Sequence, residues 1–129
     1  MRRLILILTI FCSIHGQANR TGQDGGGGSI LASEFSTFGR KGIELISYGD
    51  ETLELNEILR SISDVKVFPT NQPICQSDPN TGEIFCEDAH YYGQYKLIKF
   101  YIAKWNQMTC HEKLMLSSHE FLRAAGIEG

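Results

Sequence analysis

Two cysteines that flank a turn sequence, Cys75 and Cys86, constrain the fold of this chain more than any other feature. Between them, residues 78–82 read Asp-Pro-Asn-Thr-Gly, in which Pro presets φ and Gly accepts a positive φ. If residues 78 and 83 pair across the turn, the same register places Cys75 opposite Cys86. Directly opposed residues of an antiparallel pair lie close enough for a disulfide. The sequence therefore predicts a β-hairpin closed by a Cys75–Cys86 bond.

The first 18 residues have the composition of a secretory signal peptide. Arg2 and Arg3 form a positive head, residues 4–11 are apolar apart from one Thr, and small residues precede an expected cleavage site after Ala18. The apolar run is too short to span a bilayer, which takes about 20 residues. We therefore expect a secreted or periplasmic protein with no stable membrane insertion after cleavage.

Removal of this leader changes the cysteine count from four to three, because Cys12 leaves with it. An odd number of cysteines in an oxidising compartment leaves one pair and an unpaired thiol, or a bridge between molecules. With Cys75 bonded to Cys86, we expect Cys110 to be a buried free thiol.

The remaining composition fits one globular domain. The chain has 129 residues, of which 42% are hydrophobic. Loss of Arg2 and Arg3 changes 12 basic and 15 acidic groups to 10 and 15, a net charge of −5. This acidic balance argues against nucleic acid as a partner. Residues 19–29 are polar and glycine-rich and predict a flexible leader, followed by a single domain at 30–129.

Apolar or small side chains fall on one helical stripe along residues 30–47 and predict a helix there, with a break near Gly39 as an alternative. A second helix is expected after Asp50, which is suited to cap it. Its buried side would contain Leu55, Ile58, Leu59 and Ile62.

Two further segments predict strands. Residues 65–68 alternate until Pro69 stops them, and residues 94–103 are rich in β-branched and aromatic side chains. Together with the hairpin and a final helix, these segments predict an α+β fold. It has two N-terminal helices, a small antiparallel sheet that contains the disulfide hairpin, and a C-terminal helix packed on that sheet.

The final helix has clear signals at both ends. Thr109 and Glu112 form a capping box, and Gly126 supplies the left-handed residue that ends a helix. A helix is therefore predicted over residues 110–125. Its buried side would consist of Cys110, Leu114, Ser118, Phe121 and Ala125, flanked by Met115 and Leu122.

Inside this helix lies the dipeptide His119-Glu120. Zinc peptidases of the zincin class use His-Glu-x-x-His, because two histidines four residues apart chelate one metal ion while the Glu activates its water. Here Arg123 stands where the second histidine is needed. The structural interpretation places His119 at the edge of the buried stripe and pairs Glu120 with Arg123 on the solvated side. A zinc site remains as the alternative, if His90 and Asp88 lie against the helix.

Several of these segments, in this order, resemble a group of uncharacterised small exported proteins of predatory and related Gram-negative bacteria. The likeness rests on the Ser-Glu-Phe-Ser-Thr-Phe-Gly-Arg segment at 33–40, Asp-Val-Lys-Val at 64–67, Trp105 and the closing helix with His119-Glu120. In that group the closing helix often reads His-Glu-Tyr-Leu. The resemblance implies export and a compact α+β domain whose strand-then-helix end is similar to the zincin core.

The sequence favours a non-catalytic domain that binds a protein or envelope partner. We expect its contact surfaces at the hairpin tip, residues 78–83, and at Tyr91, Tyr92 and Tyr95, because Tyr combines a broad ring with a polar group. The alternative is that these tyrosines only cover the core. No cofactor is expected under this hypothesis. Two alternatives stay open: a degenerate zincin-like metallohydrolase with His119 as zinc ligand and Glu120 as base, and an inhibitor-like module that presents the 75–86 loop.

Overall fold

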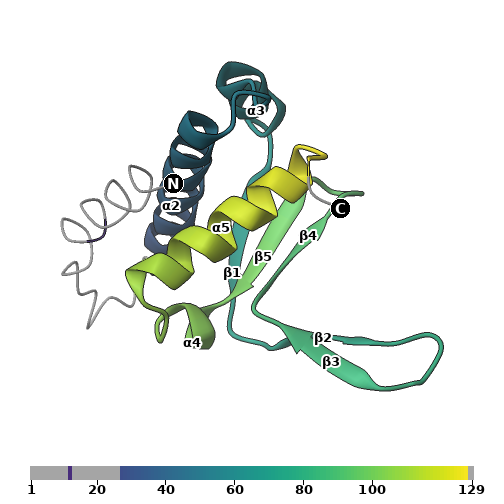
Figure 1. Ribbon diagram of the computed structural model, residues 1–129. Coiled ribbons are helices and arrows are strands. Elements are labelled where there is room, and N and C mark those ends of the chain that lie inside the picture. The colour runs from purple at the N-terminus through teal and green to yellow at the C-terminus, as the bar shows by residue number, and fades with distance from the viewer. Residues whose placement is uncertain (1–11, 13–26, 128–129) are drawn as a thin grey trace.

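The computed structural model of the chain describes Cys12 and residues 27–127 (Figure 1). The predicted signal peptide, apart from Cys12, and most of the predicted leader at 19–29 lie outside the described residues. Residues 27–29 belong to the first long helix, α2 (Gly27–Gly49), which includes the predicted helix 30–47. Across the described part of the chain, no helix has the length and apolar character needed to cross a membrane.

Helix α2 continues without a break through Gly39 and Gly42. Both glycines face the C-terminal helix. A Cβ atom at Gly39 would collide with the ring of Phe121, and one at Gly42 would lie 2.6 Å from the Cβ of Ser118. The two glycines therefore allow the helices to approach closely, and the alternative of a break near Gly39 is wrong.

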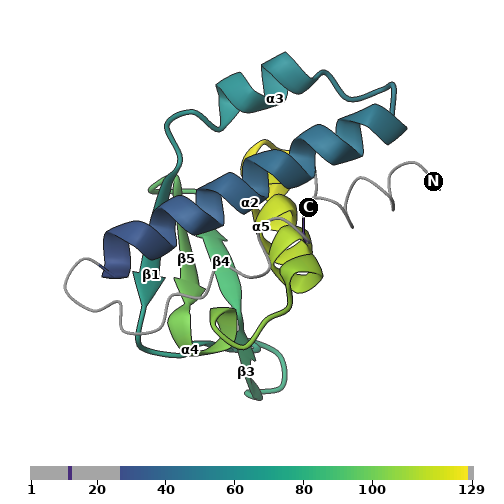
Figure 2. The same ribbon diagram turned by 90° about the vertical axis from the view of Figure 1, so that its left-hand side faces the viewer.

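The second helix, α3 (Leu55–Ser61), begins later than predicted and lies beside the C-terminal part of α2 (Figure 2). The residue before it, Glu54, makes no side-chain capping hydrogen bond. Asp50, the expected cap, instead accepts hydrogen bonds from the backbone and the hydroxyl of Thr52. These bonds lower the pKa of the Asp50 carboxyl and fix the turn after α2.

A three-stranded sheet with the order β1-β5-β4 forms the second layer. β4 runs antiparallel to β5, but β1 is parallel to β5, so the prediction of an antiparallel sheet is wrong for this pair. Two parallel strands need a long connection between them, and here the connection from β1 to β5 consists of the β2–β3 hairpin and β4. The strands are β1 (Lys66–Thr70), β4 (Ala89–Tyr92) and β5 (Leu97–Tyr101).

The strand ends differ from the prediction for local reasons. β1 continues through Pro69. An edge strand tolerates a proline because no neighbouring strand on its outer side needs a hydrogen bond from its backbone. β5 is shorter than the predicted 94–103, since Lys96 has a positive φ of 50° in the turn before it and a short helix, α4 (Ile102–Trp105), follows it.

The disulfide hairpin is confirmed, but it stands apart from this sheet. Strands β2 (Ile74–Ser77) and β3 (Ile84–Glu87) are antiparallel, with Cys75 opposite Cys86 and bonded to it. The two strands form their own sheet, contrary to the prediction of one sheet that includes the hairpin. The chain bends at Asp88, whose carbonyl accepts a hydrogen bond from the Tyr101 amide. The hairpin, which precedes this bend in the chain, extends away from the helices (Figure 1).

The C-terminal helix, α5 (Cys110–Ala124), matches the prediction closely. The Thr109 hydroxyl accepts from the Glu112 amide, and the Glu112 carboxylate accepts from the Thr109 amide, which completes the capping box. At the other end, Gly126 has a φ of 80° and the Ile127 amide donates to the carbonyl of Leu122.

Helices α2 and α5 cross on one face of the sheet, with α2 against β1 and α5 against β4 (Figures 1 and 2). The ring of Phe35 stacks on that of Phe100 at 4.6 Å and contacts Trp105 at 5.1 Å. The Trp105 indole donates to Glu34 at 2.6 Å, and the Lys113 ammonium lies 3.2 Å from the same oxygen. This network joins α2, α4 and α5 around one core.

Candidate functional site

On α5, Arg123 occupies the position at which a zinc site of the His-Glu-x-x-His type has its second histidine. Its Nη2 lies 3.0 Å from Nε2 of His119. A guanidinium can only donate, so Nε2 accepts this hydrogen bond and the ring proton lies on Nδ1. The nitrogen lone pair that would bind a metal ion is therefore directed at a cation.

Glu120 does not lie on the solvated side, as predicted, because its side chain is only 2% exposed. The charges of His90 on β4 and Glu87 on β3 act on its carboxyl, so the residue lies on the side of α5 that faces these strands. Burial raises the pKa of its carboxyl, and Glu87 acts in the same direction. Arg123, His119 and His90 oppose that rise. The prediction failed because the position is polar but lies on the face that the sheet covers.

The buried carboxylate is only partly compensated. Its Oε1 lies 3.7 Å from Nη1 of Arg123, so the predicted i,i+3 pair is present. Its Oε2 and the Nε of Arg123 are buried without a hydrogen-bond partner. An unsatisfied buried polar atom costs stability, which makes this pair a strained point of the α5–β4 contact.

His90 is paired with the hairpin instead of with α5. Its Nδ1 lies 2.8 Å from Oε2 of Glu87 and 3.1 Å from Nε2 of Gln76, and Gln76 also donates to Glu87 at 2.7 Å. Asp88 contributes its backbone carbonyl to the strand bend described above. His90 also lowers the pKa of Glu120 electrostatically, which opposes the effect of burial. Among residues 27–127 and Cys12, no three His, Cys, Asp or Glu side chains are grouped to hold a metal ion.

The three candidate tyrosines do not form one surface. Tyr91 packs against the core, whereas Tyr92 points to the opposite face of the sheet, where Lys99 Nζ lies 5.5 Å from its ring and His90 contacts its edge. Tyr95 is 68% exposed in the turn before β5. Alternation along β4 separates the first two rings.

The hairpin has two exposed apolar residues that the sequence analysis did not single out. Ile84 is 75% and Phe85 is 47% exposed. Successive strand residues point to opposite faces, so Ile84 shares one face with the Cys75–Cys86 bond and Phe85 lies on the other. The four residues of β3, Ile-Phe-Cys-Glu, do not alternate between apolar and polar, so their sequence does not indicate which side chains are exposed.

The hairpin tip is closed by its own hydrogen bonds. The Asp78 carboxylate accepts from the amides of Asn80 and Thr81, and its backbone amide donates to the carbonyl of Glu83. Gly82, with a φ of 76°, donates to the carbonyl of Asp78. The tip is therefore preorganised, and its backbone groups are largely used within the turn.

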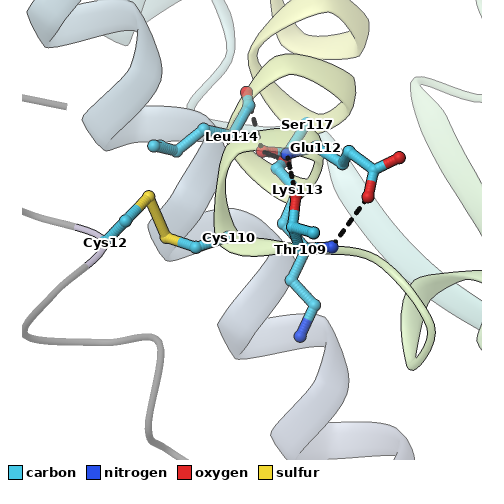
Figure 3. The surroundings of a disulfide bond; sticks show 7 residues. All are labelled: Cys12, Thr109, Cys110, Glu112, Lys113, Leu114 and Ser117. Carbon is cyan, nitrogen blue, oxygen red and sulfur yellow. Dashed lines mark hydrogen bonds between the residues drawn. A yellow bond between two sulfur atoms is a disulfide. The ribbon is translucent and has the colours of Figure 1, made fainter. Parts of the chain in front are cut away.

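Cys110 is not a free thiol, because it is bonded to Cys12 (Figure 3). The prediction assumed that Cys12 is lost with the leader and so left an odd number of cysteines. In the chain that the structure describes, both pairs are formed and no described cysteine is unpaired. Cys12 itself is 8% exposed and belongs to the apolar core.

Comparison with known proteins gives no relative: no family model, no curated protein and no solved structure matches the chain. The resemblance to small exported proteins therefore stays a prediction.

Proposed function

We propose that the protein is an exported, non-catalytic binding domain that contacts a protein partner through the β2–β3 hairpin. The observation that carries this proposal is the exposure of Ile84 and Phe85 on a ribbon that extends from the body of the molecule (Figure 1). Exposed apolar area favours contact with a partner when one partner can cover it, and a partner that grips the ribbon would cover both of its faces.

The construction of the hairpin also favours binding. The Cys75–Cys86 bond and the hydrogen bonds of Asp78 restrict the ribbon before it meets a partner. A preorganised element loses less conformational entropy on binding. The hairpin is also joined to the main sheet through the Gln76–Glu87–His90 cluster, so its direction is restrained at the base.

The position of the apolar residues favours contact through the hairpin strands over the alternative, an inhibitor-like module that presents the 75–86 loop. The tip residues are polar and turned toward each other, whereas Ile84 and Phe85 lie on the strand behind the tip. We therefore assign the contact to the faces of the ribbon. The metallohydrolase alternative has less support, because Arg123 engages His119 and Glu120 is buried away from solvent.

The test is capture of a partner from the organism's own extracytoplasmic proteins by the immobilised full chain. We expect Ile84→Ser with Phe85→Ser to abolish capture of the protein that the unaltered chain retains. Met115→Ser is the matched control, because Met115 is a 63% exposed apolar residue on α5. Circular dichroism should show unchanged melting for both variants. Equal capture by all three chains would contradict the proposal.

A further inference from the structure

The segment that the sequence marks for removal is covalently bonded to the folded domain. Cys12 lies within the predicted signal peptide, yet it is bonded to Cys110, which lies 98 positions further along the chain, and their Cα atoms are 5.4 Å apart (Figure 3). A peptide bond cut after Ala18 would not break this link, because hydrolysis of an amide leaves a disulfide intact.

The Cys110 end of the bond is held in place by the core. Cys110 is the first residue of α5, and the Thr109–Glu112 capping box fixes the start of that helix. One turn later Leu114 is buried, and the hydroxyl of Ser117 donates to the carbonyl of Lys113 at 2.6 Å. Figure 3 shows these residues around the disulfide.

The Cys12 end is also part of the packed structure. Its side chain is buried in the same apolar cluster as Phe35, Phe38 and Leu114. A disulfide sheltered in this way exchanges with thiols more slowly than an exposed one. The Cys75–Cys86 pair, by contrast, joins two exposed residues.

We propose that the Cys12–Cys110 disulfide retains the amino-terminal segment on the folded domain, so that cleavage after Ala18 yields two disulfide-linked chains and not a free domain. This inference rests on the export proposed above. It means that the exported protein keeps the apolar residues 4–11 together with Arg2 and Arg3. A dithiol releases the segment: the disulfide is reduced to two thiols while the dithiol is oxidised to its own disulfide.

The test is intact-mass spectrometry of the full chain, exported with its natural N-terminus and treated with N-ethylmaleimide before purification. Without reductant, we expect a mass that includes residues 1–18. After reduction with dithiothreitol, residues 1–18 and 19–129 should separate. An uncleaved chain with Cys12 and Cys110 protected from N-ethylmaleimide also supports retention. A domain of residues 19–129 whose Cys110 is alkylated, or is bonded to a second copy, overturns it.

The hairpin disulfide serves as the internal control for export. If Cys75 and Cys86 are bonded while Cys110 is alkylated, export stands and retention fails. If all four cysteines are alkylated, both proposals fail. In Cys12→Ser, the segment should be lost from the cleaved protein and Cys110 should take up one N-ethylmaleimide. In Cys75→Ser with Cys86→Ser, the segment should stay.

Discussion

The two disulfides close parts of the chain of very different length. Cys75–Cys86 joins residues 11 apart within a projecting hairpin, and Cys12–Cys110 joins residues 98 apart within the helical layer. The first is local and follows from a turn, whereas the second depends on how the whole chain folds. The comparison distinguishes a hairpin that is restrained by a local bond from a core in which one bond joins distant segments.

The largest expected effect is on the long-range bond. In the uncleaved chain, Cys110→Ser should lower the free energy of unfolding by about 4–5 kcal/mol, because a loop of nearly 100 residues loses the most chain entropy when it is closed. Urea unfolding without reductant measures this loss. If Cys110→Ser lowered the free energy of unfolding by less than removal of the Cys75–Cys86 bond does, the ranking of the two bonds would be reversed.

A smaller loss is expected in the hairpin. Replacing Cys75 and Cys86 together by Ser should cost about 3 kcal/mol by the same reasoning, since the closed loop is short. We expect amide hydrogen exchange to increase in β2 and β3 and to stay unchanged in α5. Faster exchange throughout α5 would show that the hairpin is not an independent element.

The close approach of α2 and α5 gives the next effect. Gly42→Ala should destabilise the protein by about 2 kcal/mol, because the new methyl group would lie 2.6 Å from Ser118 Cβ. The control is Gly93→Ala, where the nearest atom lies at 3.6 Å, an ordinary contact distance. Thermal unfolding of the two variants should differ clearly, and equal melting temperatures would be inconsistent with tight helix packing.

The smallest effect concerns Glu120 and pH. Because its folded pKa is raised, its contribution to stability is greatest below the unfolded pKa and is lost as pH rises through the folded pKa. Glu120→Gln should therefore gain stability relative to the unaltered protein at pH 8 and show little gain at pH 4. The magnitude should be about 1 kcal/mol, the cost of one unsatisfied buried group. The surrounding Arg123, His119, His90 and Glu87 are retained, so the difference between the two proteins isolates this carboxyl. A gain that is larger at pH 4 would contradict the assignment.

Local signals predicted much of the fold. Three features could be predicted because each depends on residues that are close in sequence. They are the capping box at Thr109 and Glu112, the left-handed Gly126 and the Cys75–Cys86 register. The parallel pairing of β1 with β5 was not readable, since it joins segments about 30 residues apart and alternation alone does not indicate strand direction.

The candidate site was harder to predict for the same reason. Burial of Glu120 depends on the position of β4 over α5, and the partner of His90 depends on the bend at Asp88. The bond to Cys12 is not predictable from the sequence, because Cys12 lies within the predicted signal peptide and its partner is 98 positions away. Exposure of Ile84 and Phe85 follows from the projection of the hairpin, which no short pattern encodes.

Photo-cross-linking within the hairpin tests the binding proposal most directly. The cross-linking residue p-benzoylphenylalanine would replace Phe85 in one full-length chain and Met115 in another, and both would be irradiated in the organism's extracytoplasmic fraction. The proposal predicts a covalent adduct with a different protein from position 85 and none from position 115. Adducts of equal yield from both positions, or an adduct from position 85 only with a second copy of the chain, would contradict it.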